Sequence, residues 1–146
     1  MPHQASNPKF VEEVKESFAE QMVMSLIGGE LARVEAGIIE ITLPYRRDLT
    51  QQHGYVHAGI ITTIADSACG YAAYTLMPPG SDVLAVEFKL NLLRPAKGET
   101  FTARAEVIKS GRTLTVVRAD VHAFTGDQRE LVASMQGTMM RLERSS

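Results

Sequence analysis

The stretch HGYVHAGIITTIADSACGYAAYT, residues 53–75, decides how this chain folds. Small and apolar residues fill most of it, and a lone acid, Asp66, lies near its middle with no Lys or Arg in the stretch. This composition predicts a helix over residues 58–77 that is apolar on nearly all sides, so protein must cover nearly all of it. A carboxylate in such a helix needs either a hydrogen-bonding partner or a chemical role.

The residues around this helix predict a second helix and a set of strands. An apolar residue recurs every four positions from Phe10 to Met22, which predicts one amphipathic helix over residues 8–27. Extended runs on either side of Ala36–Gly37 predict a hairpin, and four more strand-like runs follow the second helix. In one of them, residues 100–109, alternation predicts that Phe101, Ala103, Ala105 and Val107 lie on one side of the strand. Because the loops between these runs are short, the strands should pair mostly antiparallel.

This order of elements predicts an α+β fold in which one curved, mostly antiparallel sheet wraps around the central helix. We expect a single domain over residues 1–146, with a frayed tail at residues 143–146. We also expect a second subunit to cover part of the central helix, because one sheet cannot enclose an apolar helix completely.

The composition limits what the chain does. Its 146 residues are 45% hydrophobic and 22% charged, which is typical of an ordinary globular protein. The net charge of −2 argues against nucleic acid as the main partner, because no basic excess is present to neutralise phosphates. The single cysteine, Cys69, excludes an internal disulfide and favours a reducing, cytoplasmic location. Acidic residues precede the first apolar block, so we expect no secretory signal.

A membrane span is the alternative to a buried helix over residues 58–77, since about 20 residues can cross a bilayer. An acid at the position of Asp66 would cost about 2.5–3.5 kcal/mol on insertion scales, and no basic cluster flanks the segment. We therefore favour a helix buried in protein and expect no membrane association. The histidines and acids show no metal-binding spacing, so we also expect no metal.

A short constellation of residues stands at the start of the central helix. A histidine, a pair of small residues and an acid nine positions after the histidine follow one another as His57, Ala58, Gly59 and Asp66, and Gln51 lies six residues before the histidine. With the later runs LNLLRPAKG and KSGRT, this arrangement resembles the hotdog-fold acyl-CoA thioesterases of the phenylacetate-degradation type. The resemblance extends over most of the chain, residues 26–140.

The resemblance implies hydrolysis of an acyl-CoA or aryl-CoA thioester, with no cofactor beyond the CoA of the substrate. At a helix start, the backbone N–H groups near Ala58 and Gly59 lack intrahelical partners, so they suit the developing oxyanion, and Gln51 adds a side-chain donor. His57 then orients the loop. Asp66 acts either as a general base on water or as a nucleophile that forms an anhydride, and the sequence leaves both routes open. Burial among apolar neighbours should raise the Asp66 pKa.

The spacing of these groups predicts a shared active site. Ala58 and Asp66 are about 12 Å apart along a helix at roughly 1.5 Å per residue, so one thioester carbon cannot contact both. Two antiparallel copies of the helix, related by a two-fold axis, would place Gln51 and Ala58 of one chain beside Asp66 of the other. We therefore expect a homodimer, and the resemblance implies further assembly into a homotetramer.

The substrate itself needs contacts for phosphates and for the acyl group. The turn KSGRT supplies two cations, two hydroxyls and a glycine that permits close approach, and the resemblance implies that it lines the nucleotide. The predicted CoA-binding residues are Lys109, Ser110, Gly111, Arg112 and Thr113, with Arg94 and Lys97 as weaker candidates. The predicted acyl-pocket residues are Tyr55, Ile61, Ala65, Tyr71 and Phe88.

Three positions depart from the family. The family has glycine at position 58, and Ala58 keeps the backbone N–H but adds a methyl group beside it. Ala85 and Gly70 stand where some relatives carry a hydroxyl that holds the attacking water, so Gln51, a main-chain group or the substrate would have to position it.

Several structural alternatives stay open beside these functional interpretations. Asp66 could be a structural group bonded to a neighbouring turn, and the KSGRT run could be a solvated basic turn. Cys69 could be a nucleophile, although core packing is the simpler role.

Two other functions compete with thioester hydrolysis. The chain could be a non-catalytic acyl-CoA binding module, but the presence of both Asp66 and Gln51 favours an enzyme. A hotdog hydratase or dehydratase generally uses a His and acid pair in another arrangement, which this sequence lacks.

Overall fold

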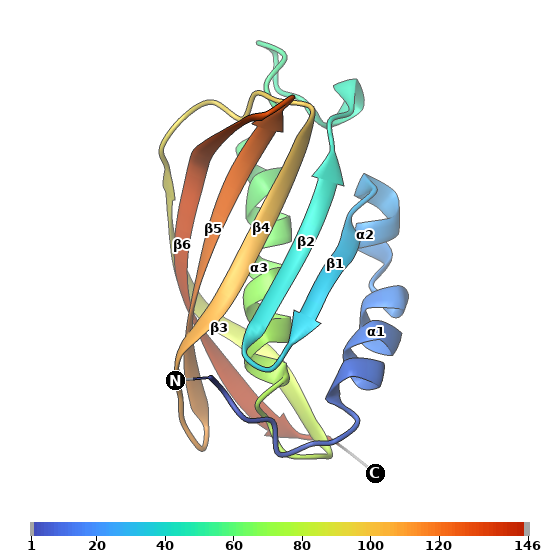
Figure 1. Ribbon diagram of the computed structural model, residues 1–146, viewed down its shortest axis with the longest axis vertical. Coiled ribbons are helices and arrows are strands. Elements are labelled where there is room, and N and C mark those ends of the chain that lie inside the picture. Colours follow the sequence, from blue (N-terminus) through green and yellow to red (C-terminus); the bar gives the residue numbers. More distant parts are fainter. Residues whose placement is uncertain (1, 145–146) are drawn as a thin grey trace.

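The central helix, α3 (Ala58–Tyr74), lies in the concave face of a six-stranded sheet in the computed structural model, which describes residues 2–144 (Figure 1). The helix begins where the sequence predicted, because the His57 side chain caps its first turn. It ends three residues earlier than predicted. Pro78 disfavours helical geometry at Met77 and has no N–H to donate, so the chain after Tyr74 closes in shorter turns instead.

Six strands form one antiparallel sheet. In chain order they are β1 (Glu30–Glu35), β2 (Ile38–Pro44), β3 (Ser81–Leu92), β4 (Thr100–Ser110), β5 (Leu114–Thr125) and β6 (Gln128–Glu143). Their order across the sheet is β1-β2-β4-β5-β6-β3, so β3 leaves the end of α3 and pairs only with β6 at the far edge. The predicted α+β hotdog architecture, a curved sheet around one helix, is confirmed.

Small side chains allow the sheet to curve closely around α3. The alternation predicted for β4 is confirmed, because Phe101, Ala103, Ala105 and Val107 are all buried on its concave face. Alanines on the facing side of α3, such as Ala68, are also fully buried. The alanines leave room for the helix, while Phe101 and the other large side chains fill the remaining space at the density of a protein core.

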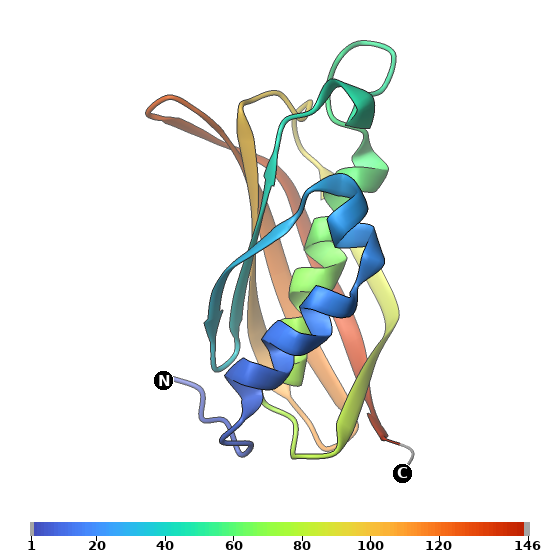
Figure 2. The ribbon, with the colours of Figure 1, turned by 90° about the vertical axis from the view of Figure 1, so that its right-hand side faces the viewer.

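The N-terminal segment forms two helices, α1 (Phe10–Glu20) and α2 (Met22–Ile27), where the sequence predicted one over residues 8–27. Gln21 has an extended backbone between them. The recurrence of an apolar residue every four positions predicted that Met22 is buried, but its side chain is 83% exposed. Met24 and Ile27 are buried instead. Burial of those two side chains in the core, together with hydrogen bonds between Gln21 and α3, outweighs the local preference for a continuous helix. Figure 2 shows α1 beside α3.

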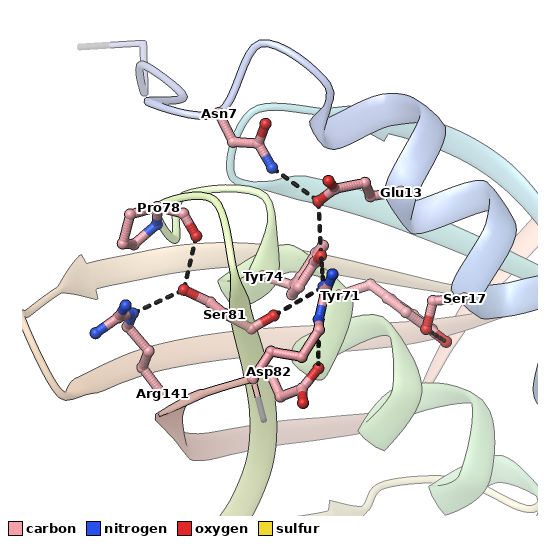
Figure 3. A network of polar contacts seen from close by, with 10 residues as sticks. Asn7, Glu13, Ser17, Tyr71, Tyr74, Pro78, Ser81, Asp82 and Arg141 are labelled. Carbon is pink, nitrogen blue, oxygen red and sulfur yellow. Dashed lines mark hydrogen bonds and ion pairs between the residues drawn. The ribbon is translucent and has the colours of Figure 1, made fainter. Parts of the chain in front are cut away.

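The end of the chain is better ordered than predicted. Glu143 still belongs to β6, and the Arg144 N–H donates to the Gly80 carbonyl at 2.8 Å. The Arg144 guanidinium also donates to the Tyr74 hydroxyl at 3.0 Å, and that hydroxyl donates to Glu13 of α1 (Figure 3). The predicted frayed tail at residues 143–146 is therefore wrong for residues 143 and 144, and residues 145–146 lie outside the described part of the chain.

Candidate active site

Asp66 lies halfway along α3, and one of its two carboxylate oxygens lacks a hydrogen-bond partner in the described part of the chain. Its Oδ1 is buried and has no hydrogen-bond partner within residues 2–144. Burial raises the pKa of the Asp66 carboxyl above its ordinary value, as the sequence predicted. A carboxylate with a structural role would be bonded to a neighbouring turn, and this oxygen is not. Asp66 is therefore a partly desolvated acid whose Oδ1 can accept a hydrogen bond or a proton from a ligand.

The Asp66 side chain faces a cavity of about 240 Å³. Gly70 and Ala85 line this cavity, so the two positions expected to neighbour the acid do so, and neither offers a hydroxyl. Four other polar side chains on α3 and the N-terminal segment line the same cavity, namely Ser17, Gln21, Ser67 and Tyr71. Tyr71, predicted for the acyl pocket, thus lies on the Asp66 side of the helix.

Two backbone amides at the start of α3 have different roles. The Gly59 N–H donates to Nδ1 of His57 at 2.8 Å, so it is engaged within the chain and cannot serve a ligand at the same time. The prediction that this amide polarises the thioester therefore has to be corrected. The N–H of Ala58, the first helical residue, has no intrahelical acceptor. A histidine in the N-cap position was the signal in the sequence from which the Gly59 contact could have been found.

Gln51 is oriented by its own loop. Its Oε1 accepts hydrogen bonds from the backbone N–H groups of His53 at 2.7 Å and Tyr55 at 3.2 Å. Because two donors fix the oxygen, the side-chain Nε2 points away from this turn and remains free to donate elsewhere. The loop is tied to the helix start, since the His57 N–H donates to the Leu49 carbonyl at 2.9 Å.

Gln51 and Ala58 share a second cavity of about 440 Å³. Tyr55 and Ile61 from the predicted acyl pocket also line it, and so does Arg94 from the predicted CoA contacts. Asp66 does not line this cavity. Within one chain, the structure therefore brings the carbonyl-polarising groups together and leaves the carboxylate on a different surface.

The remaining acyl-pocket candidates do not join this cavity. Ala65 is fully buried in the core, and Phe88 lies on β3 with 46% of its surface exposed. In a single chain, the five predicted residues are thus divided between the Gln51 cavity, the Asp66 cavity, the core and an exposed strand.

The predicted CoA-binding residues form two groups at opposite ends of β3. The turn at residues 109–113 joins β4 to β5 and is tied to β6, because the Thr113 carbonyl accepts from the Arg141 N–H at 2.8 Å. Arg94 and Lys97 follow the other end of β3 and are exposed. Only glycine fits at position 111, since a Cβ there would lie 2.6 Å from the Leu114 carbonyl oxygen. The turn is exposed throughout, so its cations are accessible to a ligand.

The alternative nucleophile has the wrong environment. Cys69 is fully buried, and burial together with the nearby Asp66 raises the pKa of its thiol to about 12. The thiol is therefore protonated at neutral pH, and core packing is the role that fits it. Among residues 2–144, no three His, Cys, Asp or Glu side chains gather in the way a metal site requires. The helices in this part of the chain are also too short or too polar to span a membrane.

Strand β3 leaves an apolar edge uncovered. It is a 12-residue strand at the edge of the sheet, and its side chains Leu84 and Val86 are 56% and 52% exposed. Edge strands are usually protected by charges, bulges or a covering element, and β3 has a bulge between Ala85 and Glu87 and the charged side chains Glu87 and Lys89. This protection is partial, because several apolar side chains of β3 remain exposed. A long edge with Leu84, Val86 and Phe88 exposed together is typical of a surface that another chain covers.

Comparisons with known proteins agree with this fold. Residues 53–130 match the family described as the Thioesterase superfamily. A crystal structure of a thioesterase family protein from Silicibacter pomeroyi is 49% identical, with a TM-score of 0.90 over 92% of this chain and 98% of that one. The PaaI protein of the phenylacetic acid degradation operon of E. coli has the same fold, with a TM-score of 0.85 over 97% of this chain and 99% of that one, at 20% identity. A 1,4-dihydroxy-2-naphthoyl-CoA hydrolase of Listeria monocytogenes is 30% identical over 62% of this chain and 73% of its own length.

Proposed function

The chain belongs to the thioesterase superfamily and is a thioester hydrolase, and from this premise we propose that it cleaves an acyl-CoA or aryl-CoA at a site shared by two copies. The products are CoA and the free acid. Gln51 and Ala58 of one copy polarise the carbonyl, and Asp66 of the other supplies the base or nucleophile. This reaction needs no cofactor besides the CoA of the substrate.

The observation that carries the proposal is the separation of the two cavities on one helix. Ala58 and Asp66 are about 12 Å apart along α3, and they line different cavities. A thioester carbon must lie within contact distance of both the oxyanion donors and the attacking group. One chain cannot satisfy both requirements, whereas two antiparallel helices can.

Two surface features support pairing of two copies. The β3 edge is long, apolar and uncovered, so antiparallel pairing of two such edges would bury it. The part of α3 that the sheet leaves uncovered carries small residues, namely Gly59, Thr63, Asp66 and Gly70. These residues recur at spacings of four, three and four, so they share one face and would let a second helix approach closely.

Two reaction routes are open to these groups, and in each the negative charge that develops on the carbonyl oxygen has to be stabilised. In the general-base route, a water oxygen attacks the carbonyl carbon while Asp66 accepts one of its protons. The carbonyl π electrons move onto oxygen, where the Ala58 N–H and the Gln51 amide donate to the oxyanion. When the oxyanion collapses, the C–S bond breaks and the CoA thiolate takes the proton from Asp66.

In the nucleophilic route, Asp66 itself attacks, CoA leaves, and water then cleaves the mixed anhydride between the acyl group and Asp66. Both routes require an unpaired carboxylate beside the carbonyl, and the orphaned Oδ1 suits both. A module that only bound acyl-CoA would gain nothing from an unpaired buried acid, whose desolvation costs stability.

Antiparallel pairing of two copies would also explain why the predicted CoA-binding cations form two separate groups in one chain. Pairing of two β3 edges would place the start of the partner's β3, and with it the partner's turn at residues 109–113, near the end of β3 that leads to Arg94. The two groups of cations, separated in one chain, would then lie on one side of the shared cavity, where they suit the phosphates of CoA. Tyr55 and Ile61 give the cavity an apolar wall for the acyl group.

The experiment that tests the proposal measures thiol release from acetyl-, medium-chain, long-chain and aryl-CoA esters. Wild-type protein should release CoA from at least one class, and Asp66→Asn should reduce the rate by several orders of magnitude with the fold intact. The aryl esters are included because the Listeria relative is named for a naphthoyl-CoA substrate. Tight binding of these esters without thiol release would instead favour the non-catalytic module.

A further inference from the structure

A cluster of polar side chains from α1, the α1–α2 junction and α3 lies on the wall of the Asp66 cavity. Gln21 is at its centre: its Oε1 accepts from the Ser67 hydroxyl at 2.9 Å, and its Nε2 donates to the Tyr71 hydroxyl at 3.3 Å. The Tyr71 and Ser17 hydroxyls are 3.1 Å apart and share a hydrogen bond. All four side chains line the cavity that holds Asp66.

The hydrogen count leaves the Ser17 and Tyr71 pair with one hydroxyl proton to donate. Ser17 and Tyr71 carry two hydroxyl protons between them, and the bond that they share uses one of them. Gln21 donates to Tyr71, so it does not take up the second proton. The second proton is therefore available to a group inside the cavity. Asp66 lines the same cavity, and its Oδ1 has no hydrogen-bond partner among residues 2–144.

We propose that Ser17, Gln21 and Tyr71 position the water that reacts at Asp66, in place of the hydroxyls that Gly70 and Ala85 cannot supply. This inference rests on the proposed function. The Tyr71 and Ser17 pair donates to the water oxygen, the water donates to Asp66, and the remaining lone pair of the water is directed at the carbonyl. In the general-base route this water attacks the thioester, and in the nucleophilic route it attacks the anhydride.

The geometry of the cluster is set by the interrupted N-terminal helix. Gln21 is the residue at which α1 ends and α2 begins, and its extended backbone presents the side chain to α3. The Tyr71 ring packs against Phe18 with centroids 6.0 Å apart, so its hydroxyl is held by packing as well as by hydrogen bonds. Burial raises the pKa of Tyr71, which keeps its hydroxyl protonated and able to donate.

Tyr74 provides a matched control on the same helix. Its hydroxyl also links α3 to α1, through Glu13 at 2.8 Å (Figure 3). Tyr74 does not line the Asp66 cavity. A loss that arises from weakened packing of α1 should therefore affect Tyr71→Phe and Tyr74→Phe alike. A loss of water positioning should affect Tyr71→Phe alone.

The test compares kcat and KM for thiol release by these two variants. We expect Tyr71→Phe to lower kcat about tenfold or more with KM changed less than about twofold, and Tyr74→Phe to leave both unchanged. We also expect Ala85→Ser, which adds a hydroxyl to the same cavity, to restore part of the lost kcat in the Tyr71→Phe background. Wild-type kcat in Tyr71→Phe, an equal loss in both tyrosine variants, or no recovery with Ala85→Ser would overturn the inference.

Asp66→Asn separates this inference from the proposed function. If Asp66→Asn is inactive while Tyr71→Phe keeps the wild-type kcat, only the positioning cluster is refuted. If Asp66→Asn keeps full activity, the proposed function of the carboxylate fails, and the positioning cluster fails with it.

Discussion

Ala58 and Asp66 belong to one continuous helix, yet each lines a different cavity. The helix start lies in the cavity with Gln51, and the acid lies in the cavity with Gly70 and Ala85. A site that uses both residues on one carbonyl therefore requires two copies of the helix.

The Ala58 amide is the first part to test. Proline is well tolerated at the first position of a helix, and the extended backbone of His57 suits a following proline. Ala58→Pro should therefore fold and yet lack the N–H that stabilises the oxyanion, with kcat about 100- to 1,000-fold lower. Ala58→Gly, which keeps the N–H, is the control and should stay within a few fold of wild type. Similar rates in Ala58→Pro and Ala58→Gly would remove this amide from the mechanism.

The buried carboxyl should make stability depend on pH. Burial raises the folded-state pKa of Asp66, so its contribution to stability is full below the unfolded pKa, about 3.9, and is lost as the pH rises through the folded value. At neutral pH the ionised group thus destabilises the fold. Thermal unfolding should show Asp66→Asn gaining stability relative to wild type between pH 4 and pH 7. A difference between the two proteins that stays constant over this range would contradict the prediction.

The turn at residues 109–113 is expected to bind the nucleotide and to take no part in the chemistry. Arg112→Ala should raise KM for CoA thioesters about tenfold, because a charge-assisted contact to phosphate is lost, and should leave kcat nearly unchanged. A thioester of pantetheine lacks the nucleotide, so its KM should not respond to the substitution. A fall in kcat alone, or an equal effect on both substrates, would assign the turn a different role.

The free edge of β3 is expected to pair with a second copy. A lysine on an edge strand opposes pairing with another strand, so Val86→Lys should shift the protein to monomers and abolish thiol release. Leu26→Lys changes another exposed apolar side chain, on α2 and away from this edge, and should leave both size and activity unchanged. Size-exclusion chromatography with light scattering measures the mass. A fully active Val86→Lys monomer would exclude the shared site.

Much of the fold could be predicted from the sequence because burial leaves a local pattern. The apolar run after residue 57 predicted the central helix, and alternation in β4 predicted which side chains face it. The start of α3 could be placed because a capping residue and a loop precede it. The polar constellation of Gln51, Ala58 and Asp66 could be identified because its spacing is local as well.

The parts that could not be predicted depend on contacts distant in the sequence. Gln21 interrupts the N-terminal helix because its side chain bonds to Ser67 and Tyr71, about 50 residues away. Arg144 is ordered by Gly80, and the two groups of cations are separated by the register of β3 on β6. Local patterns carry no signal for such contacts, so the polar cluster beside Asp66 became visible only in three dimensions.

Subunit mixing tests the shared site most directly. Asp66→Asn and Ala58→Pro should each keep at most about 1% of the wild-type kcat alone, and a heterodimer of the two should contain one intact site and one doubly altered site. We predict that purified heterodimers recover about half of the wild-type kcat per dimer, since one of the two symmetry-related sites is restored. Heterodimers that form but stay as inactive as either parent would show that both residues act within one chain, and would contradict the account.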